Sequence, residues 1–319
     1  MKSVVLDGFA VNPGDMSWDF LSEFGSYTVY DQSEESEVAG RIGDADIVMT
    51  NRRRIDKTVL AACPNLKFVS ALGTGYDMID VAACREADVE VCNIPGYSTA
   101  SVAQHAFTLL LSLITDIHGY HKAVREGRWT GQPDFLYQTI PFTELAGKTV
   151  GVFGCGAIGQ HFASLCVAFG MRVLAYRRSA APGNRNGVTF VTSDQLLAES
   201  DFLSIHCPLT DETRGLVNDD FLNRMKKGSY LINTSRGAVI QEEALYRALT
   251  SGKLAGAALD VMVKEPPAAD NPLLHLDNCI ITPHCAWTSI EARQRLIQIL
   301  AANIRSFIDT GAGINRVIG

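Results

Sequence analysis

Three glycines at fixed spacing constrain the fold of this chain more than any other feature of its sequence. Gly154, Gly156 and Gly159 directly follow the apolar run Thr149–Phe153 (TVGVF), and an apolar pattern at helical spacing begins at Ala157. A strand, a tight turn and a helix in this order let the backbone approach a pyrophosphate, whose oxygens face the amides at the helix start. The motif therefore predicts a dinucleotide-binding unit. Glycines that serve only a tight turn are the alternative.

Along the rest of the chain, short apolar runs alternate with stretches of helical periodicity, the pattern of parallel α/β sheets. The strands predicted in the first hundred residues cover 3–6, 46–50, 67–71 and 89–92. A second series covers 149–153, 171–176, 188–191, 201–206, 230–233, 257–261 and 280–282. Six or more parallel strands in about 135 residues make a complete doubly wound sheet.

Charge and hydropathy exclude several classes of partner. The chain has 28 Lys and Arg against 35 Asp and Glu, a net charge of -7, so no overall basic surface exists to bind nucleic acid or an anionic membrane. The longest apolar run, 106–114, is far shorter than the ~20 residues that cross a bilayer. The N-terminal MKSVVLDGF is typical of a first strand and lacks the apolar stretch of a signal peptide. We therefore expect a cytoplasmic protein that binds neither nucleic acid nor membrane.

The cysteine and histidine spacings predict no metal site. None of the eight cysteines is in CxxC spacing, which disfavours a zinc knuckle or a redox dithiol and leaves packing thiols as the expectation. His118 and His121 lie three residues apart in a predicted helix without a carboxylate in register. We assign these two histidines to an ordinary helix face or a subunit contact.

The residues after the second strand of the dinucleotide unit bear on the choice of cofactor. An Asp or Glu there normally accepts hydrogen bonds from the ribose 2′-hydroxyl of NAD, but here the strand ends in Arg177 and Arg178. No Asp or Glu occurs from 145 to 193, whereas Lys and Arg occur five times. An arginine pair suits a 2′-phosphate, so we favour NADP(H). NAD(H), with both arginines solvated, is the alternative.

Five further motifs follow other predicted strands. They are 72–77 (LGTGYD), 206–210 (HCPLT), 233–237 (NTSRG), 261–266 (VMVKEP) and 282–287 (TPHCAW). Together with GCGAIG, and in this order, they make the chain resemble the D-isomer-specific 2-hydroxyacid dehydrogenases over essentially its full length. The resemblance implies hydride transfer between a nicotinamide and a small 2-keto or 2-hydroxy acid.

The resemblance also implies three catalytic residues, Arg236, Glu265 and His284, each at the carboxyl end of a strand. Arg236 offers a planar fork for a carboxylate and a carbonyl together. The imidazole of His284 would protonate the developing alkoxide in reduction, and Glu265 would orient that imidazole and stabilise its charged form. Seen singly, each residue has a structural alternative; their coincidence in one domain favours a site. Cys285 is assigned to packing, because hydride transfer needs no nucleophile.

The family pattern places the cofactor against the glycine turn and the ends of the following strands. Expected cofactor contacts are Gly154, Gly156, Ala157, Ile158, Gly159, Arg177, Arg178, His206, Cys207, Pro208, Thr213, Thr234, Asp260, His284 and Ala286. Expected substrate contacts are Leu72, Gly73, Thr74, Arg236 and His284. A separate hypothesis adds Arg52 or Arg53, from the loop 51–54 (NRRR), as a contact for the anionic or hydroxyl end of the substrate. The alternative is that at least two of the three arginines are solvated on the surface.

These patterns together predict an α/β protein of two doubly wound parallel-sheet domains. A Rossmann nucleotide-binding domain at 101–289 is inserted in a flavodoxin-like substrate-binding domain made of 1–100 and 290–319, because the last helical pattern follows the second strand series. The length of 319 residues agrees with two domains at about 150 residues each. A long helix is expected over 101–126, and the resemblance implies a homodimer formed through it.

Softer similarities narrow the substrate. The opening LDGFAVNPGDMSW and the segments 93–104 and 127–129 look most like glycerate dehydrogenases, that is, hydroxypyruvate reductases. We therefore predict reduction of hydroxypyruvate or glyoxylate to D-glycerate or glycolate. Two alternatives stay open: a dehydrogenase for another 2-hydroxy acid, such as D-lactate or a branched acid, and a nucleotide-sensing binding protein without turnover, as in the related transcriptional corepressors.

Overall fold

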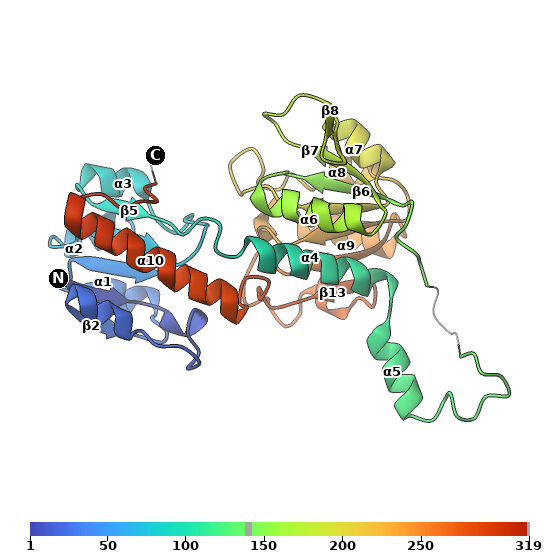
Figure 1. Ribbon diagram of the computed structural model, residues 1–319, viewed down its shortest axis with the longest axis horizontal. Helices are drawn as coiled ribbons and strands as arrows, with labels where there is room; N and C mark the ends of the chain where they lie inside the picture. Colours follow the sequence, from blue (N-terminus) through green and yellow to red (C-terminus); the bar gives the residue numbers. More distant parts are fainter. Residues whose placement is uncertain (138–141, 318–319) are drawn as a thin grey trace. The chain divides into compact units, whose positions relative to one another are not determined.

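The computed structural model describes residues 1–137 and 142–317, and the chain divides into two compact units (Figure 1). The split unit consists of Met1–Ser98 and Thr288–Gly319, and the central unit consists of Thr99–Trp287. Each unit is built on its own sheet of parallel strands, so the predicted α/β fold class is confirmed.

The split unit has a five-stranded parallel sheet in the order β2-β1-β3-β4-β5, which is the flavodoxin order. Its strands are β1 (Lys2–Val5), β2 (Ser26–Val29), β3 (Ile47–Thr50), β4 (Phe68–Ala71) and β5 (Glu90–Cys92). Its helices are α1 (Val38–Ile42), α2 (Lys57–Ala62), α3 (Val81–Glu86) and α10 (Ile290–Thr310), with 3-10 turns at Gly8–Ala10, Asp19–Phe24 and Glu35–Glu37.

Helices cover both faces of the split unit's sheet. Leu60 of α2 and Cys84 of α3 share one core cluster with Val69 of β4. The neighbouring strand residue, Phe68, instead packs against Phe307 of α10, with ring centroids 4.8 Å apart. Because consecutive strand residues point to opposite faces, the last helix of the chain covers the face that α2 and α3 leave open.

The central unit has an eight-stranded sheet in the order β13-β12-β11-β10-β6-β7-β9-β8, parallel except for the edge pair β8 and β9. The strands are β6 (Thr149–Phe153), β7 (Arg172–Tyr176), β8 (Gly183–Arg185), β9 (Val188–Phe190), β10 (Phe202–Ile205), β11 (Ser229–Asn233), β12 (Leu254–Leu259) and β13 (Cys279–Ile281). The helices are α4 (Thr99–Ile114), α5 (Ile117–Arg125), α6 (Ala157–Ala168), α7 (Ser193–Glu199), α8 (Asp219–Arg224) and α9 (Glu242–Thr250), with 3-10 turns at Gly237–Val239 and Pro272–His275.

Two core clusters lie on opposite faces of the central unit's sheet. Helices α4 and α6 contribute Phe107 and Phe162 to one cluster, and α7, α8 and α9 contribute Leu196, Phe221 and Leu245 to the other. The chain runs from β6 outward to β7 on one side and continues from β10 on the other side. The topological switch point, where open sheets of this kind bind ligands, therefore lies between β6 and β10.

The predicted helix over 101–126 is wrong as a single element. Helix α4 ends at Ile114, and α5 begins at Ile117 after a bend of 57°. Asp116 starts the second helix by accepting a hydrogen bond from the amide of Gly119 at 2.8 Å. A residue that caps a new helix disfavours continuation of the old one, and this capping role is the signal that periodicity alone did not show.

Two strands were missed because neither buries a side chain. The residues of β2 alternate between exposed and half-buried, and all three residues of β8 are exposed. Both are edge strands, where apolar patterning is weakest. All eight cysteines are free, and six of them are buried, so the packing prediction is confirmed.

Within 1–137 and 142–317, no single helix is long and apolar enough to cross a membrane. Helices α4 and α5 reach that length and composition only as a pair bent by 57°.

Candidate active site

The glycine turn after β6 is built for close approach of backbone. Gly154 has a φ of +94°, and a Cβ there would lie 2.5 Å from the amide nitrogen of Cys207. A Cβ on Gly159 would lie 2.7 Å from the carbonyl oxygen of Gly154, which shows how tightly α6 sits on the turn. A Cβ on Gly156, the N-cap of α6, would meet no atom within 4 Å. The turn therefore has no room for a side chain at Gly154 or Gly159, where it packs against protein, but has open space at Gly156. Ala157 and Ile158 follow as the first residues of α6.

The loop after β10 lies beside this turn. The amide of His206 donates to the carbonyl of Phe153 at the end of β6, at 2.8 Å. Burial lowers the pKa of His206 to about 4, so its imidazole is neutral at neutral pH, and its Nε2 lies 2.9 Å from the Ser204 hydroxyl. Thr213 closes the loop by donating to the carbonyl of Pro208 at 2.7 Å. A neutral imidazole and a hydrogen-bonded loop thus lie beside the glycine turn.

Arg177 and Arg178 follow β7 and are exposed. Burial raises the pKa of the Cys155 thiol in the glycine turn, and the guanidinium of Arg177 opposes that rise, so Arg177 lies near the turn. The pKa of the Glu212 carboxyl is lowered chiefly by a hydrogen bond from Thr210, and in part by the charge of Arg178. An acid from outside 145–193 therefore does approach the arginine pair. The acid-free stretch of sequence is not free of acids in space.

The turn after β11 carries Arg236. The side chain of Asn233 braces it, because its Oδ1 accepts from the amide and hydroxyl of Ser235 and its Nδ2 donates to the carbonyl of Arg236. Gly237 has no room for a side chain, since a Cβ would collide with the backbone of Met262. This close packing brings the half-buried Arg236 next to the segment that leads to Glu265.

Glu265 and His284 form a hydrogen-bonded pair. Oε2 of Glu265 lies 2.7 Å from Nδ1 of His284, and Oε1 accepts from the amide of Met262 at 3.1 Å. Each of the two side chains is about a quarter exposed. An ionised carboxylate only accepts, so Nδ1 carries the proton of this bond and Nε2 is left for proton exchange with a ligand.

Asp260, directly after β12, organises the segment that carries His284. Its side chain is 1% exposed. Burial would raise the pKa of this carboxyl, but hydrogen bonds from His105, Thr282 and the amides of Ala286 and Cys285 outweigh burial and hold the pKa below its usual value. Asp260 is therefore an ionised, buried anchor.

One predicted cofactor contact has an unsatisfied group. The hydroxyl oxygen of Thr234, after β11, is buried without a hydrogen-bond partner in the part of the chain that the structure describes. An orphaned buried hydroxyl is unfavourable unless a ligand satisfies it. Together with the open start of α6, it fits a dinucleotide bound along the carboxyl ends of the strands.

Four of the predicted substrate contacts, Arg52, Leu72, Gly73 and Thr74, belong to the split unit. Arg52 follows β3 and the segment 72–74 follows β4, and Asn51 joins them by donating from Nδ2 to the carbonyl of Leu72 at 2.8 Å. The buried Asp7, after β1, accepts from the amides of Asn51 and Arg52 at 2.7 and 2.6 Å. Asp7 was missed by sequence reasoning, since its partners lie more than forty residues away. Gly73 and Thr74 complete the loop, whose Thr74 hydroxyl donates to the carbonyl of Ile94.

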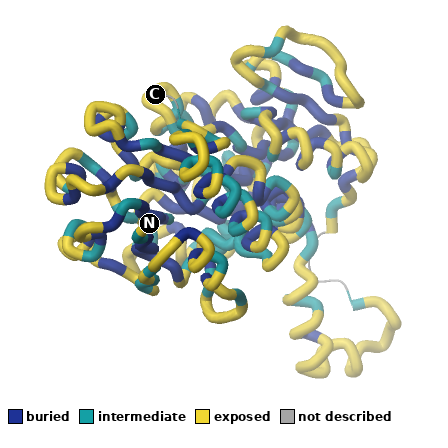
Figure 2. Tube along the Cα trace, turned by 60° about the vertical axis from the view of Figure 1, so that its left-hand side comes forward, coloured by how far each residue is buried: buried dark blue, intermediate teal, exposed yellow. Residues whose placement is uncertain are grey.

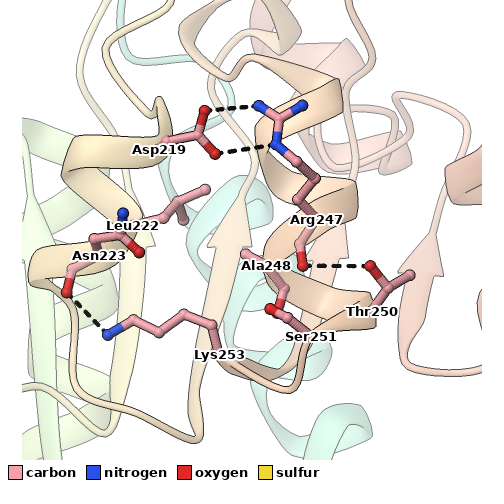
Figure 3. A pocket seen from close by; sticks show the side chains of 8 residues that line it. All are labelled: Asp219, Leu222, Asn223, Arg247, Ala248, Thr250, Ser251 and Lys253. Carbon is pink, nitrogen blue, oxygen red and sulfur yellow. Dashed lines mark hydrogen bonds and ion pairs between the residues drawn. The ribbon is translucent and has the colours of Figure 1, made fainter.

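A pocket of about 420 Å³ between α8 and α9 lies elsewhere (Figure 3). Arg247 in this pocket forms two hydrogen bonds with Asp219, and Lys253 donates to the carbonyls of Asn223 and Met225. Both cations of this pocket, Arg247 and Lys253, are therefore already paired with acceptors of the protein itself. Lys253 also precedes β12, so the pocket is at the amino end of that strand, away from Asp260.

Comparisons with known proteins show which family and which solved structures the chain is similar to. Residues 107–286 match the family described as D-isomer specific 2-hydroxyacid dehydrogenase, NAD binding domain. The chain is 44% identical over 321 residues to a hydroxypyruvate reductase of Blautia hydrogenotrophica, covering 99% of both chains. It is similar in structure to an acyclic imino acid reductase in complex with NADPH and D-Arg, with a TM-score of 0.88, 31% identity and full coverage of both chains. An NADPH-dependent glyoxylate/hydroxypyruvate reductase of Sinorhizobium meliloti, in complex with NADP and malonate, aligns with a TM-score of 0.85, 28% identity and coverage of 99% and 96%.

The glycine turn generates a first prediction. Gly156→Ala should fold normally, because its Cβ meets open space, yet weaken dinucleotide binding about tenfold or more by occupying the room for the pyrophosphate. Gly159→Ala should lower both the melting temperature and the affinity, because its Cβ collides with Gly154. Thermal unfolding and fluorescence titration with NADPH measure the two effects.

The matched control is Gly40→Ala in α1, which also meets open space and should leave both quantities unchanged. Unaltered NADPH affinity in Gly156→Ala would contradict the assignment of this turn to the cofactor.

Proposed function

Because this chain belongs to the D-isomer-specific 2-hydroxyacid dehydrogenases, we propose that it reduces hydroxypyruvate or glyoxylate to the D-2-hydroxy acid, with NADPH as the hydride donor. The observation that carries the proposal is the Glu265–His284 pair at 2.7 Å. The ionised Asp260 holds the segment of His284, and the turn that carries the half-buried Arg236 packs against the backbone of Met262. The related hydroxypyruvate and glyoxylate reductases support the choice of substrate.

In this proposal, residues of the central unit bind the substrate and transfer the proton. Arg236 pairs with the substrate carboxylate and polarises the ketone, because its guanidinium presents parallel N–H donors. His284 delivers a proton from Nε2 to the ketone oxygen, and Glu265 holds Nδ1 so that this nitrogen faces the substrate. The nicotinamide, when bound, supplies the hydride to the carbonyl carbon. In the direction of oxidation, His284 accepts the proton.

Substrate contacts in the split unit complete the proposal. The backbone amides of Gly73 and Thr74 bind the substrate carboxylate, and Arg52 contacts the far end of the acid. The amide of Leu72 instead donates to the carbonyl of Thr50 at 2.7 Å and holds the loop against β3. Support comes from the hydrogen bonds of Asp7 and Asn51, which tie the Arg52 loop and the 72–74 loop to one another.

We assign the cofactor contacts to the glycine turn, to the loop after β10, and to the ends of β11, β12 and β13. The residues that would hold it are Gly154, Gly156, Ala157, Ile158, Gly159, His206, Cys207, Pro208, Thr213, Thr234, Asp260, His284 and Ala286. Arg177 and Arg178 would bind the 2′-phosphate of NADPH, and the NADPH and NADP complexes of two structural relatives support that preference. NAD(H) is the alternative.

A panel of substrates tests the function and the cofactor together. We expect kcat/KM for hydroxypyruvate or glyoxylate to exceed that for pyruvate and branched 2-keto acids, and NADPH to exceed NADH by about tenfold or more. Arg177→Ala and Arg178→Ala should raise KM for NADPH but not for NADH, because only NADPH has the phosphate. Spectrophotometric assays of nicotinamide oxidation supply these values.

Lys227→Ala is the control, since it removes an equal charge between α8 and β11, at the amino edge of the same sheet. Equal or better use of NADH would overturn the assignment of the arginine pair. A chain that binds NADPH but oxidises none with any keto acid would be a nucleotide sensor. Faster turnover of a keto acid mixed with an amine would instead indicate imine reduction, as the imino acid reductase suggests.

A substitution of the proton donor tests the mechanism. His284→Gln should lower kcat by about 10²- to 10⁴-fold, because general acid catalysis is lost, while the Kd of NADPH changes little. The control His275→Gln makes the same exchange at an exposed histidine and should leave kcat unchanged. Loss of NADPH binding in His284→Gln would point to a structural histidine instead.

We further propose that the enzyme is a cytoplasmic homodimer. Helix α5 and the residues after it are exposed over nearly their whole length (Figure 2). The exposed side chains there include Ile117, Trp129, Phe135 and Leu136, and large exposed apolar side chains close together in a chain favour a protein contact. An apolar hollow of about 670 Å³ at the end of α4 adjoins this segment. Because the apolar residues Ala106, Phe107, Leu109 and Leu110 of α4 are buried within the central unit, the dimer contact is assigned to α5 and the following residues.

Light scattering after size exclusion tests the dimer. We expect a mass of twice the chain for the unmodified protein and about half of that for Ile117→Glu, since a buried charge in an apolar contact is unfavourable. Ile308→Glu in α10, a similarly exposed isoleucine, should keep the dimer mass. A monomer in the unmodified protein would contradict the proposal.

A further inference from the structure

We infer that His105 is a positioning residue for the segment 282–286, which carries His284. Through its Nε2–H it fixes the hydroxyl of Thr282, and that hydroxyl in turn supports the carboxylate of Asp260. The inference rests on the proposed function, because it assigns His284 the role of proton donor.

The hydrogen bonds determine which nitrogen of His105 carries the proton. The Thr282 hydroxyl donates to Oδ1 of Asp260 at 2.6 Å, because an ionised carboxylate can only accept. A hydroxyl has one proton, so its contact with Nε2 of His105, at 3.0 Å, must be one in which Thr282 accepts. His105 is therefore protonated on Nε2. The same nitrogen lies 3.4 Å from Oδ1 of Asp260, so its positive edge also faces the carboxylate.

Asp260 binds the chain on both sides of His284, through Thr282 before it and through Cys285 and Ala286 after it. Its Oδ1 accepts from the amide of Cys285 and its Oδ2 from the amide of Ala286, both at 2.9 Å. Its carbonyl accepts from the amide of His284 itself at 2.8 Å. His284 has a φ of +54°, a left-handed conformation that a residue with a Cβ adopts only when its surroundings impose it. The hydrogen bonds to Asp260 impose it.

Helix α4 supports the same segment at two points. Ser101 donates to the carbonyl of Ala286 at 2.6 Å, and His105 contacts Thr282 at the other end of the segment. Residues four apart lie on one face of a helix, so both contacts come from the same side. The buried residues Ala103 and Ala106 fix α4 against the sheet. A rigid helix thus determines where the ends of the His284 segment lie.

A metal ion is the competing explanation for this cluster. The ligand atoms of His105, Asp260 and Cys285 lie within 4.8 Å of one another. However, Oδ1 of Asp260 already accepts from Thr282 and from the amide of Cys285, which occupies both of its lone pairs. Hydrogen bonds therefore account for the arrangement.

Substitutions of His105 and Thr282, the first two members of the hydrogen-bond chain that leads to Asp260, test the inference. His105→Leu removes the donor and should lower kcat about tenfold or more by displacing His284, with KM for the keto acid changed less than about twofold. His105→Gln keeps an N–H donor at similar reach and should restore kcat to within about threefold of the unmodified enzyme. Thr282→Val should match His105→Leu, and the double variant should be no worse than either single one, because both break the same chain of hydrogen bonds.

His275→Leu, at an exposed histidine, is the control for the substitution itself. Unchanged kcat in His105→Leu, failure of the Gln variant to restore it, or additive effects in the double variant would each overturn the inference.

A second measurement does not depend on activity. Nitrogen-15 NMR of histidine-labelled protein reports the tautomer of each imidazole, and we expect the proton of His105 on Nε2. A proton on Nδ1 alone would overturn the inference even if the variants lose activity. If the unmodified protein reduces no keto acid, the proposed function fails, whereas the tautomer still tests the contact with Thr282.

Discussion

The candidate active site depends on one buried carboxylate that stays ionised. Desolvation penalises the charge of Asp260, and only a full set of donors can offset that penalty. Those donors are the groups that must be positioned: the amides on the far side of His284 and a threonine hydroxyl at the start of the same segment. The charge and the geometry of the segment therefore stabilise each other. An apolar residue at this position would leave two amides and a hydroxyl without their acceptor.

Two histidines at the carboxyl ends of the strands show how the surroundings of an imidazole determine whether it can exchange protons. The half-buried His206 lies beside the glycine turn, and desolvation of its imidazole lowers its pKa to about 4, which keeps it neutral near pH 7. A neutral imidazole suits a binding surface, because it carries no charge and does not exchange a proton with a bound ligand. His284 is partly exposed and holds a carboxylate on one nitrogen, so it can exchange a proton on the other. The same residue type is thus a neutral group at the end of β10 and, in the proposed mechanism, the proton donor after β13.

The parts of this architecture that could be predicted from sequence are those set by local patterns. Parallel strands, the glycine turn and the motifs after strand ends are readable because each depends on a few adjacent residues, and the carboxyl ends of parallel strands must gather at one edge. What sequence reasoning missed depends on distant partners. His105 meets Thr282 across 177 positions of the chain, and Asp7 meets Asn51 across 44. A histidine inside an apolar helix and an aspartate after a first strand gave no pattern that pointed to those partners.

The basic stretch around the glycine turn is another case in which sequence alone missed distant partners. The structure reduces the number of its basic residues that bear on the choice between NADPH and NADH. Its five Lys and Arg residues have no acid nearby in sequence, but the fold brings acids to several of them. Arg172 pairs with Glu199 at 2.7 Å, Lys148 acts on Asp201, and Arg178 acts on Glu212. Arg185 instead lies over the ring of Phe190. Arg177 differs from these four, because the group on which its charge acts is the Cys155 thiol in the glycine turn. The proposed recognition of a 2′-phosphate would therefore depend more on Arg177 than on the summed charge of the stretch.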